Sequence, residues 1–315
     1  ASDIPLLNWN GATTEPDWSA YPNWPVGGST KQSGLYLATR LRASDALSFI
    51  AGARWSNWES RQSSLVTGDI YDDRKERNVF TPYAAVIYDL TPQLSAYGSY
   101  TTIFNPQYNK DVNGRALDPE TGKNVELGLK GEWFNGRLNA SVAVFQSGKN
   151  NLAVRDGDRL TPEGDFAYRA EDDTKARGWE LEVVGEPMPG WRVQGSYAQV
   201  VLKDSAGERL ATDTQPKHQF KLFTTWTPAS LNRLTVGGGL LWQSERYEAQ
   251  DPATRHIYTI KSYAVVNLMA RYAFNKHLSL AVQLNNVFDK TYRSATDLHY
   301  YGAPRNLYAT LKYQF

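Results

Sequence analysis

Few residues in this chain have the type and spacing that catalysis or metal binding requires. Cysteine is absent, which excludes thiol catalysis, zinc–thiolate sites and disulfide bonds, and neither an HExxH motif nor a Walker loop is present. The four histidines are scattered along the chain, at His218, His256, His277 and His299. Residues 111–114 (DVNG) begin like a calcium-binding loop, but Asp118 and Glu120 do not complete its spacing, so we expect a glycine-containing turn. With no nucleophile beside a base, the sequence predicts that the protein is not an enzyme.

Aromatic residues are the abundant chemistry-bearing type, with 10 tryptophans, 19 tyrosines and 11 phenylalanines beside 24 glycines. The net charge is +1, from 34 Lys and Arg against 33 Asp and Glu, so no basic field indicates a nucleic acid partner. Mean hydropathy is −0.54 and no run of about 18 apolar residues occurs, so no helical membrane span is expected. A chain rich in aromatics and glycine yet polar on average is typical of a transmembrane β-barrel, because only alternate strand residues face lipid.

Period-two alternation bounded by turn residues recurs along the chain and places these aromatics on strands. In one segment Leu280 and Val282 share a face that opposes Gln283, and in another Leu268 opposes Arg271. We therefore predict an all-β fold, an antiparallel transmembrane β-barrel. The thirteen predicted strands are 31–43, 45–60, 77–90, 92–104, 120–134, 137–152, 169–186, 190–203, 214–227, 232–247, 258–274, 276–290 and 304–315.

The connections between the predicted strands alternate between short and long. The short connections lie near residues 43–44, 91–92, 135–136, 187–189, 227–229 and 275–276. The long connections are 61–76, 105–119, 153–168, 204–213, 248–257 and 291–303. Short turns at one end and long loops at the other are typical of an outer-membrane barrel, with turns in the periplasm and loops outside the cell. Asn135 and Gly136 also suit a tight hairpin turn with positive φ.

Aromatic residues on the apolar face gather at both strand ends. Near the short turns are Trp133, Trp191, Trp226, Phe274 and Phe315, and near the long loops are Trp55 and Trp242. Two such rings are typical of the girdles at the two membrane interfaces, whereas the alternative is an aromatic core inside a soluble sandwich. We predict that the outward residues include Leu280, Val282, Leu311 and Trp226, and that the lumen residues include Lys130, Arg271 and Gln283.

An odd number of strands is unusual, because bacterial single-chain barrels have an even number. Phe315 falls at the periplasmic end, while residues 1–30 fall by parity at the long-loop end. We therefore expect residues 1–30 to be an extracellular loop segment and residues 31–315 to be the C-terminal portion of a larger barrel. In that case strands 31–43 and 304–315 do not pair with each other. The alternative is that residues 1–10 form a weak fourteenth strand.

Several short stretches resemble a known family of transport proteins. Residues 284–292 (LNNVFDKTY), 301–305 (YGAPR) and 313–315 (YQF) are similar to the C-terminal signature of TonB-dependent outer-membrane receptors. The stretches that resemble the ferric-siderophore branch are 80–83 (FTPY), 100–107 (YTTIFNPQ), 117–124 (LDPETGKN) and 178–182 (GWELE). Within that branch the ferric-pyoverdine and coprogen receptors are the most similar, and the resemblance spans essentially the whole chain.

This resemblance implies binding and TonB-energised import of a ferric siderophore at the outer membrane of a Gram-negative bacterium. Family members carry an N-terminal plug with a TonB box inside a barrel of about 22 strands, of which this chain would cover roughly the last thirteen, without the plug. The implied partners are the ferric siderophore, outer-membrane lipid, the TonB complex through the plug, and the barrel-assembly machinery through Phe315. No cofactor is implied, because iron arrives bound to the siderophore.

Other functions remain open at this point. A passive outer-membrane pore would lack a plug and bind nothing tightly. A TonB-dependent receptor for another cargo, such as cobalamin or a glycan, would share the architecture. An outer-membrane protease or lipase would need an acid, a histidine and a serine gathered in the folded lumen.

A siderophore satisfies its iron with its own oxygens, so the implied site needs aromatic planes and a few donors rather than metal ligands. The candidate ligand-binding residues, at the outer strand ends or in the loops, are Trp58, Tyr108, Arg246, Tyr247, Tyr300 and Tyr301. Trp9, Trp18 and Trp24 of the first segment are further candidates. The guanidinium of Arg246 would meet an anionic or hydroxamate group. The alternative for each aromatic ring is packing within its own loop.

Overall fold

The computed structural model describes residues 26–65, 68–209, 215–247, 259–294 and 300–315. In this part of the chain the regular elements are strands, apart from one 3-10 turn at Ala229–Leu231. The thirteen strands of the main sheet are β1 (Val26–Arg42), β2 (Leu47–Ser64), β3 (Ile70–Thr91), β4 (Leu94–Asn105), β5 (Glu120–Trp133), β6 (Leu138–Asn150), β9 (Thr174–Met188), β10 (Trp191–Lys203), β11 (His218–Trp226), β12 (Leu234–Gln243), β15 (Tyr263–Ala273), β16 (Leu278–Asn285) and β17 (Asn306–Tyr313), neighbours in that order. The predicted all-β fold with thirteen antiparallel sheet strands is confirmed.

Cross-strand register assigns the side chains of the sheet to two faces, because directly paired residues of antiparallel strands point the same way. One row consists of Trp191, Trp226, Val236, Ala270, Val282 and Ala309. A row of the opposite face consists of Ser95, Lys130, Ser141, Glu182, Ser196 and Lys221. We call these the apolar face and the polar face.

The predicted division of the side chains between the two faces is confirmed. Leu280 pairs with Leu311 and lies two residues from Val282, which places both leucines on the apolar face with Trp226. Arg271 pairs with Ala281, two residues from Gln283, and both belong to the polar face with Lys130. A shift of one residue in register would move these charged side chains to the apolar face. If that face met lipid, each arginine or lysine at the bilayer midplane would cost about 2–4 kcal/mol of stability.

The described residues form two compact units. The first contains residues 26–34 with Ser56–Val79, and the second contains Leu35–Trp55 with Phe80–Phe315. The first unit therefore consists of parts of β1, β2 and β3. Inside it Arg74 Nε lies 2.7 Å from Asp72 Oδ1, and the backbone N–H of Asn78 donates to Asn57 Oδ1 at 2.9 Å.

The predicted long connection 61–76 is wrong in its extent. β2 continues to Ser64 and β3 begins at Ile70, so the connection is only 65–69. Ser56, Trp58, Ser60 and Ser64 are the buried residues in the outer half of β2. The residues that the prediction missed, 61–64 (RQSS) and 70–76 (IYDDRKE), are mostly polar, so the apolar alternation that the prediction relied on is lost there although both strands persist.

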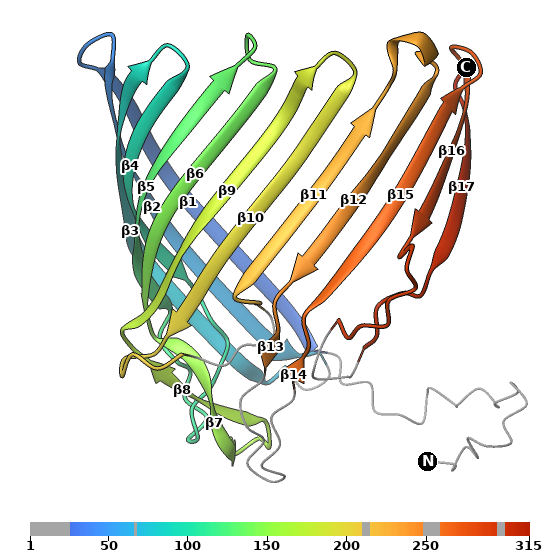
Figure 1. The fold of residues 1–315 in the computed structure, drawn as a ribbon. Coiled ribbons are helices and arrows are strands. Elements are labelled where there is room, and N and C mark those ends of the chain that lie inside the picture. Colours follow the sequence, from blue (N-terminus) through green and yellow to red (C-terminus); the bar gives the residue numbers. More distant parts are fainter. Residues whose placement is uncertain (1–25, 66–67, 210–214, 248–258, 295–299) are drawn as a thin grey trace, which may run out of the picture. The chain divides into compact units, whose positions relative to one another are not determined.

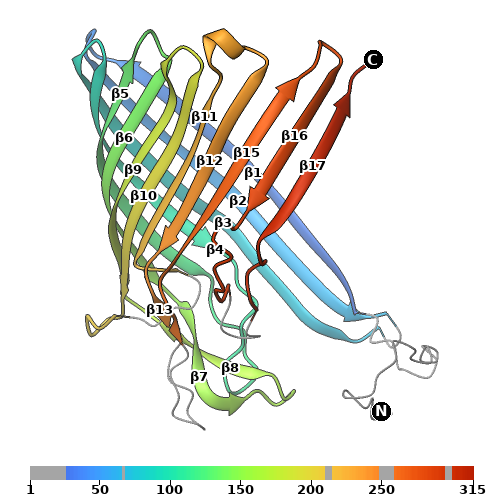
Figure 2. The same ribbon diagram turned by 45° about the vertical axis from the view of Figure 1, so that its right-hand side comes forward.

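Two small hairpins leave the main sheet. β7 (Leu152–Leu160) pairs with β8 (Phe166–Glu171) inside the predicted connection 153–168, and β6 pairs with β9 past them. β13 (Arg246–Tyr247) pairs with β14 (Thr259–Ile260), so the predicted strands 232–247 and 258–274 each break near their outer end. Figures 1 and 2 show these four strands beyond the sheet at the long-loop end of the second unit.

The short connections lie where they were predicted. Those between β5 and β6, β9 and β10, β11 and β12, and β15 and β16 share one end of the second unit (Figure 1). Asn135 and Gly136 have φ of 57° and 82°, which confirms the predicted positive φ in that turn. β1 and β17 stand at the two ends of the strand order, so among the described residues they are not paired, as predicted. None of the helical segments described is long and apolar enough to cross a membrane.

Candidate functional site

Two groups of loop residues stand at the long-loop end of the second unit, where the sequence placed most of its candidate binding residues (Figure 2). The C-terminal cluster comprises residues 243–247, 259–265, 286–294 and 300–305. The hairpin cluster comprises residues 105–119 and 150–174. Each cluster is described by its own contacts.

The C-terminal cluster is built on an apolar core. Ile260 is 1% exposed, and Tyr263 and Val265 are buried beside it. The rings of Tyr263 and Tyr292 stack with centroids 4.4 Å apart. A side chain at Gly302 would press into the Tyr292 ring, since an added Cβ would overlap Tyr292 Cζ. The glycine is therefore required for the loop to close over that ring.

The loop after β16 is held by one buried side chain, Asn286. Its Oδ1 accepts from the backbone N–H of Lys290 at 2.8 Å, and its Nδ2 donates to the carbonyls of Lys290 at 2.9 Å and Ala303 at 3.1 Å. Asp289 Oδ1 accepts from the backbone N–H of Arg305 at 2.8 Å. Asn286 and Asp289 adopt positive φ, which asparagine and aspartate tolerate better than other non-glycine residues. Residues 284–292, the stretch that resembles a family signature, thus close the loop and connect it to the residues just before β17.

This frame positions the candidate tyrosines of the C-terminal loop. The backbone N–H of Ser294 donates to the carbonyl of Tyr300 at 2.7 Å, and Arg293 pairs with Tyr301 and lies 5.8 Å from the centre of its ring. Tyr300 and Tyr301 are 58% and 60% exposed, so their rings are available at the surface.

Arg246 joins the same cluster from β13, but as a buried residue. It is 9% exposed and its Nη2 donates to the carbonyl of Ser294. Its neighbour Tyr247 is placed by its backbone, which pairs with Thr259. Ser294 thus links Arg246 to Tyr300, and Tyr301 is held next to it by Arg293.

The hairpin cluster is held by polar contacts instead. Gln107, 7% exposed, donates to the carbonyls of Asp118 and Asn151, the latter at 2.8 Å. The backbone N–H of Tyr168 donates to the carbonyl of Lys110 at 2.8 Å, which joins β8 to the 105–119 loop. Lys110 Nζ lies 3.8 Å from Glu163 Oε1, and both side chains are partly solvated.

Two carboxyl groups of the hairpin cluster have shifted proton affinities. Asp111 Oδ1 accepts from the backbone N–H groups of Arg115 and Asn113, each at 2.8 Å, and the Arg115 bond is the main cause that lowers the pKa of this carboxyl. The pKa of Glu163 is also lowered, chiefly by the nearby Thr161 side chain. Both environments favour the ionised carboxylate. The 111–114 segment is thus a turn closed on Asp111, with Gly114 at φ 75°.

Tyr108 belongs to the hairpin cluster and is 48% exposed. Trp58 belongs to the first compact unit, where it lies within β2 and is 8% exposed. Trp9, Trp18, Trp24, His256 and His299 lie outside the described residues. No group of three or more His, Cys, Asp or Glu among the residues that the structure describes is arranged to hold a metal ion.

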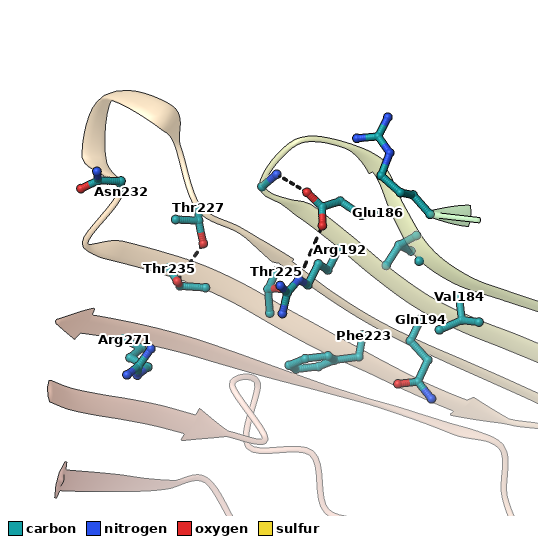
Figure 3. A pocket seen from close by; sticks show the side chains of 14 residues that line it. Val184, Glu186, Arg192, Gln194, Phe223, Thr225, Thr227, Asn232, Thr235 and Arg271 are labelled. Carbon is teal, nitrogen blue, oxygen red and sulfur yellow. Dashed lines mark hydrogen bonds and ion pairs between the residues drawn. The ribbon is translucent and has the colours of Figure 1, made fainter. Parts of the chain in front are cut away.

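A hollow on the polar face lies at the opposite, short-turn end of the second unit (Figure 3). It is lined by Arg271, Arg192, Glu186 and Phe223 among others, from strands β9 to β15. Glu186 Oε2 lies 3.9 Å from Arg192 Nε, and Glu186 Oε1 accepts from the backbone N–H of Gly190 at 2.8 Å. The hollow therefore has a charged lining, in which the carboxylate of Glu186 already has partners within the chain.

The profile of the family described as "TonB dependent receptor-like, beta-barrel" matches residues 4–287. The chain belongs to this family of TonB-dependent receptor β-barrels. Membership places it in the bacterial outer membrane, where the lipid-facing side of such barrels is apolar and the lumen side is polar.

Several relatives of this chain are ferric-pyoverdine receptors. It is 40% identical to the ferric-pyoverdine BN7/BN8 receptor and 39% identical to the ferric-pyoverdine 358 receptor, both of Pseudomonas putida, over 98% and 99% of its own length. Those alignments cover 37% and 39% of the relatives, so the chain spans about two fifths of their length. The crystal structure of the ferripyoverdine receptor of the Pseudomonas aeruginosa outer membrane, bound to ferripyoverdine, matches with a TM-score of 0.84 and 34% identity over 98% of this chain and 42% of that one.

Sequence reasoning named Tyr108 but missed the β7–β8 hairpin beside it. A signal was present, since residues 161–165 (TPEGD) carry turn residues between two short alternating runs. The role of Gln107 and the burial of Arg246 gave no comparable signal, because their partners are backbone carbonyls whose position depends on the folded loops.

Proposed function

We propose that this chain is the C-terminal barrel portion of an outer-membrane receptor that binds a ferric siderophore of the pyoverdine class and imports it with energy supplied through TonB. The observation that carries the proposal is the similarity to ferric-pyoverdine receptors over 98% of the chain. Residues 31–315 are then the barrel portion and residues 1–30 an extracellular segment. The protein acts as a transporter rather than an enzyme, with iron as part of its cargo and no cofactor of its own.

The exposed tyrosines at the long-loop end support a binding surface there. Tyr300 and Tyr301 are held by a packed cluster, and Tyr108 stands on the hairpin cluster, so little ordering is needed when a rigid chelate covers the rings. Burial of aromatic surface contributes about 25 cal/mol per Å² before ordering costs. Tyr247 completes the proposed surface, and Arg246 contributes by holding the carbonyl of Ser294. Trp58, in the first unit, is a separate candidate for ligand binding.

The remaining proposed partners meet other parts of the chain. The charged hollow beside Arg271 and Glu186 suits contact with a plug domain, through which the TonB complex would act. The barrel-assembly machinery would recognise the C-terminal strand that ends at Phe315. Outer-membrane lipid would cover the apolar face.

The proposal is tested in the whole gene product, expressed in a strain that lacks its own siderophore receptors. Uptake of radioactive iron from a ferric pyoverdine should depend on this gene and stop when TonB is deleted. The double variant Tyr300→Ala/Tyr301→Ala should weaken pyoverdine binding at least tenfold and leave the amount of folded barrel unchanged. As the matched control, Trp133→Ala/Trp191→Ala should lower thermal stability in the membrane and leave affinity within twofold.

The alternatives predict other results in the same assays. A passive pore would let small solutes through without TonB and show no saturable binding. A receptor for cobalamin or a glycan would restore growth on that nutrient and not on ferric siderophores under iron limitation.

A further inference from the structure

A row of lysines crosses the apolar face at its long-loop end. Cross-strand register places Lys123, Gly148, Lys175 and Lys203 directly beside one another on β5, β6, β9 and β10. Arg177, two residues along from Lys175 on the same face, adds a further cation, with its Nε donating to Gln146 Oε1 at 2.7 Å. We call Lys123, Lys175 and Lys203 the lysine row. Further toward the short-turn end the residues of this face are apolar, such as Leu127, Val144 and Leu181, so the cations are confined to its outer edge.

The charge of the lysine row is only partly balanced. Lys175 lies 3.2 Å from Asp173 Oδ1, but of the ion pairs formed by the described residues none includes Lys123 or Lys203. Lys175 and Lys203 are direct cross-strand partners, about 5 Å apart at the backbone. Like charges directly opposed in this way destabilise a sheet. A phosphate group between the two ammonium groups would turn that repulsion into two charge-assisted contacts.

The height of the row matches the edge of the membrane. Lys123 precedes Trp133 by ten residues on β5, and Trp133 belongs to the aromatic ring of the short-turn end. Ten residues rise about 34 Å along a strand, or about 24–28 Å along the membrane normal at a tilt of 35–45°, which equals the apolar band of such barrels. Lys203 is twelve residues from Trp191 on β10, two more than separate Lys123 from Trp133. Those two residues place Lys203 about 5 Å further along the membrane normal, away from the short-turn end. The row therefore spans the headgroup layer.

A notch in the row gives access to it. Gly148 lies between Lys123 and Lys175 and has no side chain, so the surface is hollowed there, with Tyr100 and Gln146 along the rim. The ring of Tyr100 is 41% exposed, and aromatic rings of this kind commonly stand at headgroup level. The notch thus combines space, two flanking ammonium groups and an interfacial ring.

We propose that the lysine row binds the phosphorylated headgroup of an outer-leaflet membrane lipid, with one phosphate between Lys175 and Lys203 and a second in the notch between Lys123 and Lys175. The binding site faces lipid rather than the lumen, so it is separate from the proposed siderophore surface. A bound lipid would fix β5, β6, β9 and β10 against one another at the base of the hairpin cluster.

The test uses the whole gene product in nanodiscs of phosphatidylcholine, with and without diphosphorylated lipid A, and native mass spectrometry to count bound lipid. The triple variant Lys123→Gln/Lys175→Gln/Lys203→Gln should lose at least tenfold in affinity for the diphosphorylated lipid, since each lysine near an anionic surface is worth about fivefold. The control variant Lys130→Gln/Lys221→Gln/Lys276→Gln removes as many charges elsewhere and should bind as the parent does. The triple Lys→Arg variant keeps the charge and should bind as well, which separates charge loss from misfolding.

Three results would overturn the proposal. The first is affinity of the Lys→Gln triple within twofold of the parent. The second is an equal loss in the control variant. The third is displacement of the lipid by inorganic phosphate or pyrophosphate as readily as by lipid A, which would assign the row to a soluble anion. Monophosphorylated lipid A should bind more weakly than the diphosphorylated form, and equal binding of the two would contradict the second phosphate position.

Discussion

The two loop clusters stand at the same end of the sheet and are held together by different forces. The C-terminal cluster has a buried core around Ile260 and Tyr263 and an asparagine that satisfies three backbone groups. The hairpin cluster has Gln107, an exposed ion pair at Lys110 and backbone contacts to β8. Apolar packing is insensitive to salt and acid, whereas exposed polar contacts respond to both. The C-terminal cluster is thus suited to present a rigid surface, whereas the hairpin cluster is suited to change its conformation.

The largest expected effect is loss of the apolar core. Ile260→Ala should destabilise the C-terminal cluster by about 2–4 kcal/mol, because it removes a fully buried side chain and leaves a cavity. Hydrogen exchange of residues 286–294 should then accelerate while that of residues 105–119 stays unchanged. Leu160→Ala in β7, where the side chain is half exposed, is the matched control. Faster exchange in both clusters would show that they are one cooperative unit.

Gly302→Ala should cost about 1–3 kcal/mol, since the added methyl group meets the Tyr292 ring. Pyoverdine binding should weaken with it, because Tyr301 is the adjacent residue. Gly195→Ala is the control, as its added methyl group would stand 3.5 Å from Leu222 in ordinary contact. If Tyr292→Ala does not relieve the effect of Gly302→Ala in the double variant, the clash is not its cause.

In the hairpin cluster, Gln107→Leu should cost about 1–2 kcal/mol, since the carbonyls of Asp118 and Asn151 each lose a buried donor. The loss should appear as faster hydrogen exchange in residues 105–119 and 151–172 alone. Asn286→Leu is the matched change in the other cluster and should accelerate exchange only there. Equal responses of both clusters to either change would end the distinction drawn between them.

The smallest effects concern charge. Lys110→Gln should change stability by less than about 0.5 kcal/mol, because the pair with Glu163 is exposed and screened. The pKa values of Asp111 and Glu163 are lowered in the folded loop, so their stabilising contribution is present above the ordinary carboxyl pKa and is lost as pH falls through the folded values. Acid should therefore loosen the hairpin cluster first, as measured by exchange protection corrected for the intrinsic rate at each pH. Loosening of the C-terminal cluster at the same pH would contradict this order.

The sheet was predictable because its chemistry repeats. Alternation along residues 278–284 and turn residues such as Asn135 and Gly136 are local signals, and they gave every strand of the main sheet and the side of Arg271 and Lys130. The outer ends of β2 and β3, residues 61–64 and 70–76, were missed because they are mostly polar and carry no apolar alternation. The site was less predictable. The sequence indicated that Tyr300 and Tyr301 lie in an outer loop, but the burial of Arg246 depends on its contact with Ser294, a distant segment that no local period records.

The direct pairing of β6 with β9 has a consequence for how such receptors diversify. The hairpin of β7 and β8 enters and leaves at one point, where the N–H of Asn151 donates to Asp172 Oδ1 at 2.9 Å and the N–H of Asp173 donates to Asn150 Oδ1 at 3.1 Å. Next to this point β6 and β9 pair directly with each other, with Lys149 opposite Thr174. The β7–β8 hairpin is therefore an insertion whose sequence and length can change without disturbing the pairing of β6 with β9.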